Sequence, residues 1–294
     1  MKNKHVDGIK ASTVILLVAS ACLFIFTIYT WYNNLYMRDT NVVWGAFNNA
    51  LDTKGVTKEI SLSAQDVTQK QTIIYSFSPE LETFGEVRTE GPGEKVTVNQ
   101  TISTPKKDFS RYSELVQPDP VALNDIINIW AQTTPDTATE STLMGQQFAS
   151  GPLVLVGNFS HDYRSALLQK MKSSGAYEVM GRAGTKKFGD KTAIIYKVKL
   201  DVDAYNLVLT DYLTKLGLDE SAQAVSNAGG DTSFPIIEIA VEPRTRTVMA
   251  AGYPTLDASG AEKYSLWGVG KDIEAPESFL SFDELQTKLQ SIYN

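Results

Sequence analysis

The stretch SGAYEVMGRAGTKKFGDKTAIIYKVKLDVDAY, residues 174–205, predicts a β-hairpin. Its first strand begins near Tyr177, and the segment Phe188-Gly189-Asp190-Lys191 supplies a turn. After the turn every second residue is apolar: Ile194, Tyr196, Val198 and Leu200. Because successive side chains of a strand point to opposite faces, these four share one face. A strand start near Tyr177, a Gly-containing turn and an alternating strand after it are typical of two paired antiparallel strands.

Four segments before this hairpin have the same character: EISLSAQ (59–65), QTIIYSFS (71–78), TFGEVRT (83–89) and KVTVNQTIS (95–103). Polar or Gly- and Pro-containing turns separate them, which favours successive antiparallel strands. The two-residue repeat predicts one apolar face, made of Ile60, Leu62, Ile73, Tyr75, Phe77, Val96, Val98 and Ile102, opposite Thr97, Asn99 and Thr101. Three more strands are predicted at 236–241, 247–252 and 264–269.

Helical spacing of apolar residues predicts helices at 41–51, 123–132, 160–174, 204–216 and 219–227. The segment Ser281-Phe282-Asp283-Glu284 is a capping box that opens a C-terminal helix. Residues 133–142 are rich in Thr, Pro and acidic side chains, which favours a loop or lid. This order of elements predicts an α+β fold, in which inserted helices partly cover the apolar face of a long antiparallel sheet.

Composition excludes several classes of function. The 294 residues carry a formal charge of -7 with a pI near 5.0, whereas a nucleic-acid surface needs clustered Lys and Arg. Cys22 is the single cysteine, and His5 and His161 are the two histidines. A disulfide framework, a multi-cysteine zinc site and a histidine-rich metal centre are therefore not expected.

Residues 11–32, ASTVILLVASACLFIFTIYTWY, contain no charged side chain and predict a transmembrane helix. Lys2, Lys4 and Lys10 precede this run, so the positive-inside rule predicts a cytoplasmic N-terminus and an extracytoplasmic C-terminal domain. The predicted parts are a cytoplasmic tail (1–10), the anchor (11–32), a linker (33–40) and one extracytoplasmic domain (41–294). Two alternatives remain open, cleavage of the segment as a secretory signal and lipidation of Cys22.

Several of these segments together resemble the half-barrel lipoprotein-carrier superfamily (LolA-like), and within it the LppX/LprG-type lipid-binding lipoproteins. They are the opening helix running into KEISLSAQ, the 174–205 stretch, PIIEIAVEPRTRTVMAAGYP (235–254) and EKYSLWGVGKDIEAPESFLSFDELQ (262–286). The resemblance implies a curved half-barrel sheet whose concave face is covered by helices, with a hollow between them for acyl chains. The transmembrane anchor departs from the family, whose carriers are usually soluble or lipidated.

The resemblance implies a protein that binds a lipid or an acylated molecule. Together with the predicted anchor, it leads us to expect a membrane-anchored, bacterial cell-envelope protein that needs no cofactor. Strand phasing supplies the candidates for lining the ligand cavity: Ile60, Leu62, Tyr75, Phe77, Val96, Val98, Ile194, Tyr196, Val198 and Trp267. The alternative is that these side chains form an ordinary core. The domain would then be a non-enzymatic sensory or protein-interaction module that recognises another envelope protein.

Catalytic chemistry has weak support in the sequence. Ser160-His161-Asp162 holds the residue types of a triad, but a triad is assembled from separated positions, so we interpret Ser160 as a helix N-cap. The chain also lacks a Gly-x-Ser-x-Gly elbow, a phosphate-binding Gly-Lys loop and a His-Glu-x-x-His zinc helix. We therefore expect a protein without enzymatic activity, catalytic residues or a metal site.

Overall fold

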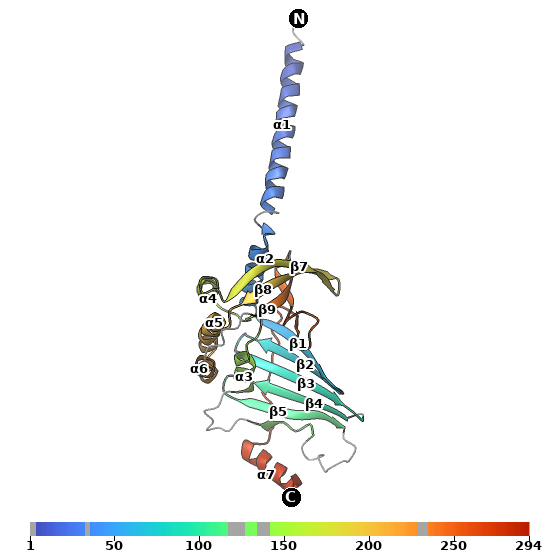
Figure 1. Cartoon of the computed structure of the whole chain (residues 1–294), viewed down its shortest axis with the longest axis vertical. Helices are drawn as coiled ribbons and strands as arrows, with labels where there is room; N and C mark the ends of the chain where they lie inside the picture. Colours follow the sequence, from blue (N-terminus) through green and yellow to red (C-terminus); the bar gives the residue numbers. More distant parts are fainter. Residues whose placement is uncertain are drawn as a thin grey trace.

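A computed structural model describes residues 4–32, 36–93, 95–116, 127–133, 142–228 and 235–293, and leaves the side chains of 4–15, 286 and 289–293 outside the description. Within these ranges eleven strands form one antiparallel sheet in the order β6-β5-β4-β3-β2-β1-β11-β10-β9-β8-β7. Figure 1 shows this sheet as a single twisted surface with helices beside it. The predicted α+β class, with a large open antiparallel sheet, is confirmed.

The first half of the sheet is a meander of neighbouring strands. Its members are β1 (Gly55–Ala64), β2 (Val67–Ser76), β3 (Glu82–Gly91), β4 (Lys95–Ser103), β5 (Asp108–Val116) and the two-residue β6 (Ala131–Gln132). The four strands predicted before the hairpin correspond to β1–β4. The alternation of apolar side chains had not indicated β5.

The second half contains the predicted hairpin and three further strands. These are β7 (Tyr177–Phe188), β8 (Lys191–Leu200), β9 (Ile236–Glu242), β10 (Thr247–Gly252) and β11 (Glu262–Ser265). The strand β11 ends earlier than predicted, because Leu266 adopts a left-handed φ of 51° and the chain leaves the ladder there. The pairing of β11 with β1 joins the two halves into one sheet.

Five helices lie on one face of the sheet: α2 (Asp39–Ala50), α3 (Leu143–Ala149), α4 (His161–Ser173), α5 (Val202–Lys215) and α6 (Asp219–Asn227). Their apolar faces and the inner face of the sheet share one buried cluster, which includes Phe47, Phe148, Leu209, Tyr196 and Ile239. The helices predicted at 41–51, 160–174, 204–216 and 219–227 are confirmed within two residues at each end.

Two helices extend away from this core, at opposite ends of the molecule (Figure 1). The C-terminal α7 (Phe282–Tyr293) opens with the predicted capping box, in which the Ser281 amide and hydroxyl donate to Glu284 Oε2. The N-terminal α1 (Lys4–Trp31) is one continuous helix. Among the residues that are described, no helix is both long and apolar enough to cross a membrane. The predicted anchor at 11–32 is therefore not confirmed.

The helix predicted at 123–132 is wrong where the structure describes it. Residues 123–126 lie outside the described ranges, and so does 134–141 of the predicted loop. From Ala131 the chain pairs as β6 with β5, and the Gln132 amide donates to the carbonyl of Leu280 at 2.9 Å. Asn128 has a left-handed φ of 62°, which a continuing helix does not allow. Residues 131–132 therefore take their structure from pairing with β5 and with Leu280, which are distant in sequence.

Gly55 offers a test of the packing where β1 begins. A Cβ atom at Gly55 would lie 2.4 Å from the Val269 carbonyl oxygen and 2.9 Å from that of Tyr75, and neither backbone atom can rotate away. We expect Gly55→Ala to lower the free energy of unfolding by about 1–3 kcal/mol. Denaturant unfolding followed by tryptophan fluorescence measures this.

The matched control is Gly184→Ala in β7, where an added Cβ meets nothing within 4 Å. This change should stay within about 0.5 kcal/mol of the parent protein. Equal stabilities of the two variants would contradict the placement of the segment around Val269 against β1.

Candidate functional site

The space between the sheet and the helices is filled by a stretch of the chain itself, Gly151–Gly157, which we call the inner segment. It follows α3, and no residue of it belongs to a described strand or helix. Pro152 and the run Val154-Leu155-Val156 are buried, and Leu153 is half-buried. A buried stretch outside regular structure is uncommon, because its backbone polar groups still need partners.

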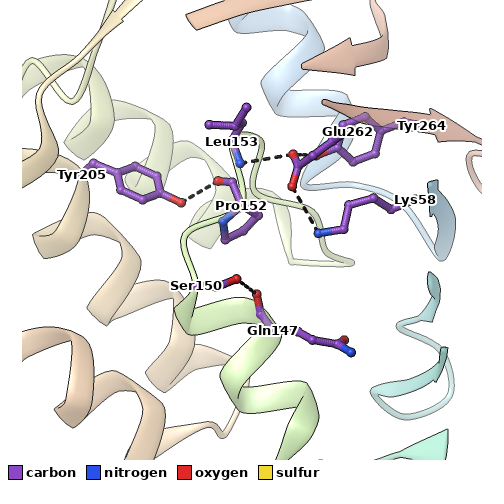
Figure 2. Close-up of polar contacts among 8 residues, drawn as sticks. All are labelled: Lys58, Gln147, Ser150, Pro152, Leu153, Tyr205, Glu262 and Tyr264. Atoms are coloured by element: carbon purple, nitrogen blue, oxygen red, sulfur yellow. Dashed lines mark hydrogen bonds and ion pairs between the residues drawn. The ribbon is translucent and has the colours of Figure 1, made fainter. Parts of the chain in front are cut away.

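Tyrosine hydroxyls supply several of these partners. The Tyr205 hydroxyl donates to the Pro152 carbonyl at 2.6 Å, and that of Tyr212 donates to the Val156 carbonyl at 2.6 Å. Both tyrosines belong to α5. The Tyr177 hydroxyl, from β7, donates to the Leu153 carbonyl at 3.2 Å. Figure 2 shows Tyr205 reaching the inner segment from the helix side.

A buried ion pair holds the inner segment from the sheet side. Lys58 Nζ on β1 lies 3.3 Å from Glu262 Oε1 on β11, and the two side chains are only 6% and 9% exposed. The second carboxylate oxygen accepts from the Leu153 amide at 3.3 Å and from the Tyr264 hydroxyl. Glu262 therefore bonds the neighbouring strand and the inner segment at the same time (Figure 2).

The same burial changes the acid–base properties of these groups. Burial raises the pKa of Tyr264, Tyr205 and Tyr212 well above the ordinary tyrosine value. For Lys58, burial alone would lower the pKa, but Tyr75 and the Glu262 carboxylate raise it above its usual value. We therefore expect Lys58 to be charged and the buried tyrosines to be neutral at physiological pH.

Six of the ten predicted cavity residues belong to the main buried cluster or pack against it, and this cluster also contains Val154, Leu155 and Val156. Tyr75, Tyr196 and Val198 belong to the main buried cluster, and Phe77, Ile194 and Trp267 pack against it. Trp267 lies beyond the end of β11 rather than on a strand, and its indole N–H donates to the Val248 carbonyl at 2.9 Å. The structure thus places six candidates in or against the buried cluster that contains the inner segment, without testing whether they bind a ligand.

The other four candidates lie elsewhere. Ile60 and Leu62 share the face of Tyr75 but lie farther along β1, outside the main cluster, and Leu62 is 41% exposed. Val96 and Val98 lie on the opposite face of the sheet, which corrects the prediction of one shared apolar face. The register is the reason: Ile73 is opposite Gly85, and Gly85 is opposite Thr101. Thr101, with Thr97 and Asn99, therefore shares the face of Tyr75.

Four hollows of about 200–400 Å³ on the described surface are not lined by Lys58, Tyr75, Glu262 or Tyr264. This polar cluster instead contacts the backbone of its own chain, through the bond from the Leu153 amide to Glu262. Ser160 does occupy the N-cap position of α4, but its side chain makes no capping bond, and His161 is exposed. Within the described ranges, no three His, Cys, Asp or Glu side chains are grouped so that they could hold a metal ion.

Comparison with known proteins gives little. No protein-family model matches the chain. No curated protein matches it either. Among solved structures, the crystal structure of LprF from Mycobacterium bovis is matched at 10% identity with a TM-score of 0.36, over 81% of this chain and 96% of that one. At this TM-score the likeness adds nothing to what the geometry says about function.

The ion pair gives the first test of the site. Glu262→Gln should lower the free energy of unfolding by about 3–5 kcal/mol, because it leaves the Lys58 ammonium buried without its counter-charge. Adding Lys58→Met to this variant should restore much of the loss. The control is Lys186→Met, which removes the exposed pair with Asp257 and should cost less than about 1 kcal/mol. A Glu262→Gln protein as stable as the parent would contradict the burial of this pair.

The buried tyrosines predict how stability depends on pH. Their pKa is higher in the folded protein than in the unfolded chain, so the stability they contribute is complete below about pH 10 and is lost as the pH rises above it. Tyrosinate absorbance should therefore appear in two steps, exposed tyrosines first and buried ones together with unfolding. Complete tyrosinate formation in a protein whose circular dichroism is unchanged would show that these hydroxyls are accessible.

Proposed function

We propose that the chain is a membrane-anchored, extracytoplasmic protein without enzymatic activity that binds the apolar chain of a lipid or an acylated molecule. The ligand would lie between the sheet and α3–α5, where the inner segment now lies. One observation carries this proposal: the inner segment is a buried apolar stretch whose backbone does not pair with any of the described strands. It thus occupies the protein core much as an apolar ligand would.

The contacts of the inner segment support its exchange for a ligand. Toward α5 and β7 it is held by three tyrosine hydroxyls, and a hydroxyl bond contributes about 0.5–1.5 kcal/mol net. Gly151, at its start, has a left-handed φ of 78° that glycine adopts without strain. At its end Gly157 makes backbone bonds with Ala50 and Thr53, so residues 152–156 can leave the core while Gly157 stays in place.

The chain length that a ligand needs follows from the apolar surface that the inner segment would expose on leaving the core. Exposing the four apolar residues 153–156 costs about 1.5–3 kcal/mol each, or roughly 6–12 kcal/mol together. Each methylene of a ligand contributes about 0.8 kcal/mol on burial, so eight carbons give about 6 kcal/mol and sixteen about 13 kcal/mol. An acyl chain of about sixteen carbons offsets the displacement, and one of eight does not.

The uncharged run 11–32 supports the membrane anchor of this proposal. Its apolar length suits a bilayer, lysines precede it, and Tyr29, Trp31 and Tyr32 stand at its far end, where aromatic rings favour the interface. The N-terminus would be cytoplasmic and the sheet domain extracytoplasmic, in a bacterial envelope.

A second candidate function is a sensory or interaction module that uses the sheet as a scaffold. The observation that favours it is the dense core: Tyr196 and Val198 are 0% exposed, and Tyr75 is 2% exposed. In this alternative the inner segment never leaves, and the domain recognises another envelope protein through its surface.

Chain-length selectivity and tyrosine substitution distinguish the two candidates. We expect the full chain, purified in a lipid-free detergent, to bind hexadecanoic acid but not octanoic acid in native mass spectrometry. Tyr205→Phe/Tyr212→Phe should raise the apparent affinity about tenfold, because it weakens only the state in which the inner segment is buried.

The matched control is Tyr163→Phe, since the Tyr163 hydroxyl donates to the Asp211 carbonyl and not to the inner segment. This variant should bind like the parent. Fatty acid bound along the anchor would respond to none of these substitutions. If neither the parent nor the double variant binds hexadecanoic acid, the interaction module becomes the better proposal.

A further inference from the structure

A hollow of about 400 Å³ lies where the N-terminal helix meets the sheet domain, and we call it the collar hollow. Its walls include Trp31 at the end of α1, Tyr36, Trp44 on α2, Leu168 and Lys172 on α4, and Arg246. Aromatic rings and two cations from five parts of the chain thus surround one space. None of these residues contributes to the inner segment.

Arg246 is fixed in this hollow by its surroundings. Asn49 Nδ2 donates to the carbonyls of Thr245 and Arg246 at 3.0 and 3.2 Å, which holds the β9–β10 turn against α2. The Arg246 side chain then passes over Gly45, where an added Cβ atom would come 2.4 Å from Arg246 Cδ. Its guanidinium lies 4.2 Å from the ring centre of Tyr36, and Nη2 donates to the Tyr36 carbonyl at 3.2 Å.

Both cations lack a counter-charge among the described residues. Lys172 Nζ lies 5.1 Å from the ring centre of Trp44, and no described carboxylate lies within 4 Å of Lys172 or Arg246. Arg246 also retains one unused donor, because its Nε is buried with no acceptor among the described residues. A guanidinium and an ammonium beside one cavity are the groups that bind phosphate in proteins.

We propose that the collar hollow binds the phosphate group of a membrane phospholipid. The proposal rests on the membrane anchoring proposed above, because α1 would place the hollow at the level of the headgroups. Trp31, Tyr36 and Trp44 suit that level, since tryptophan and tyrosine favour the boundary between hydrocarbon and water. Lys172 and Arg246 then contact the phosphate oxygens, and Leu168 and the rings contact the glycerol and upper acyl carbons.

The test uses the full chain in a lipid-free detergent and three probes: dihexanoyl-phosphatidylglycerol, dihexanoyl-phosphatidylcholine and inorganic phosphate. Tryptophan fluorescence reports binding, because Trp31 and Trp44 line the hollow. Both phospholipids should bind, and Lys172→Gln should weaken both about tenfold, the effect of losing one charge-assisted contact. Added salt should weaken binding as well, because it screens exposed charges.

The matched control is Lys170→Gln on the same helix, since Lys170 pairs with Asp211 away from the hollow. It should bind like the parent, and equal binding by Lys172→Gln and Lys170→Gln would overturn the proposal. Inorganic phosphate that binds as tightly as the phospholipids would also overturn it, by showing an anion site without lipid selectivity. Carbonate extraction of membranes tests the anchor separately, so its failure and that of the collar hollow can be told apart.

Discussion

The pairing of Lys58 with Glu262 is the contact on which the rest of the arrangement depends. The two residues belong to β1 and β11, whose pairing joins the N-terminal meander to the C-terminal strands. Two charges buried at this junction are tolerated only while they stay together, since an isolated buried charge is costly. The pair therefore favours the register that makes one sheet of two halves. Glu262 also accepts from the Leu153 amide, so the same carboxylate determines where the inner segment lies.

Between Pro152 and Val156 the inner segment is held by side chains, and at its end Gly157 makes backbone bonds with Ala50 and Thr53. A strand in the same place would be held by a ladder along its whole length. Tyr177, Tyr205 and Tyr212 each give one hydroxyl to a carbonyl that would otherwise be buried without a partner. A ladder of backbone bonds would have to break before the segment could leave. Three separate hydroxyl bonds satisfy the backbone with fewer bonds to break, and a filled core held in this way is compatible with the proposed replacement by a ligand.

Local patterns predicted the local elements, and contacts between distant residues determined the rest. The 177–200 hairpin and the Ser281 capping box follow from neighbouring residues, and both are confirmed. The predicted face of Val96 and Val98 was wrong. Alternation divides the side chains of one strand between two faces, but it does not tell which of these faces is continuous with the apolar face of the next strand. The inner segment left no signal, since its partners, such as Tyr205 and Glu262, lie about 50 and 110 residues away.

The two proposed binding places meet on α2 (Asp39–Ala50). Trp44 and Gly45, in the middle of this helix, line the collar hollow. At its C-terminal end the Ala50 and Leu51 carbonyls accept from the amides of Gly157 and Phe159, where the inner segment ends. Twelve residues of α-helix measure about 18 Å, so one rigid element links the collar hollow to the core. A shift of α2 would act on both places, and a lipid with its phosphate at the collar approaches the core from the end at which the inner segment is tied to α2.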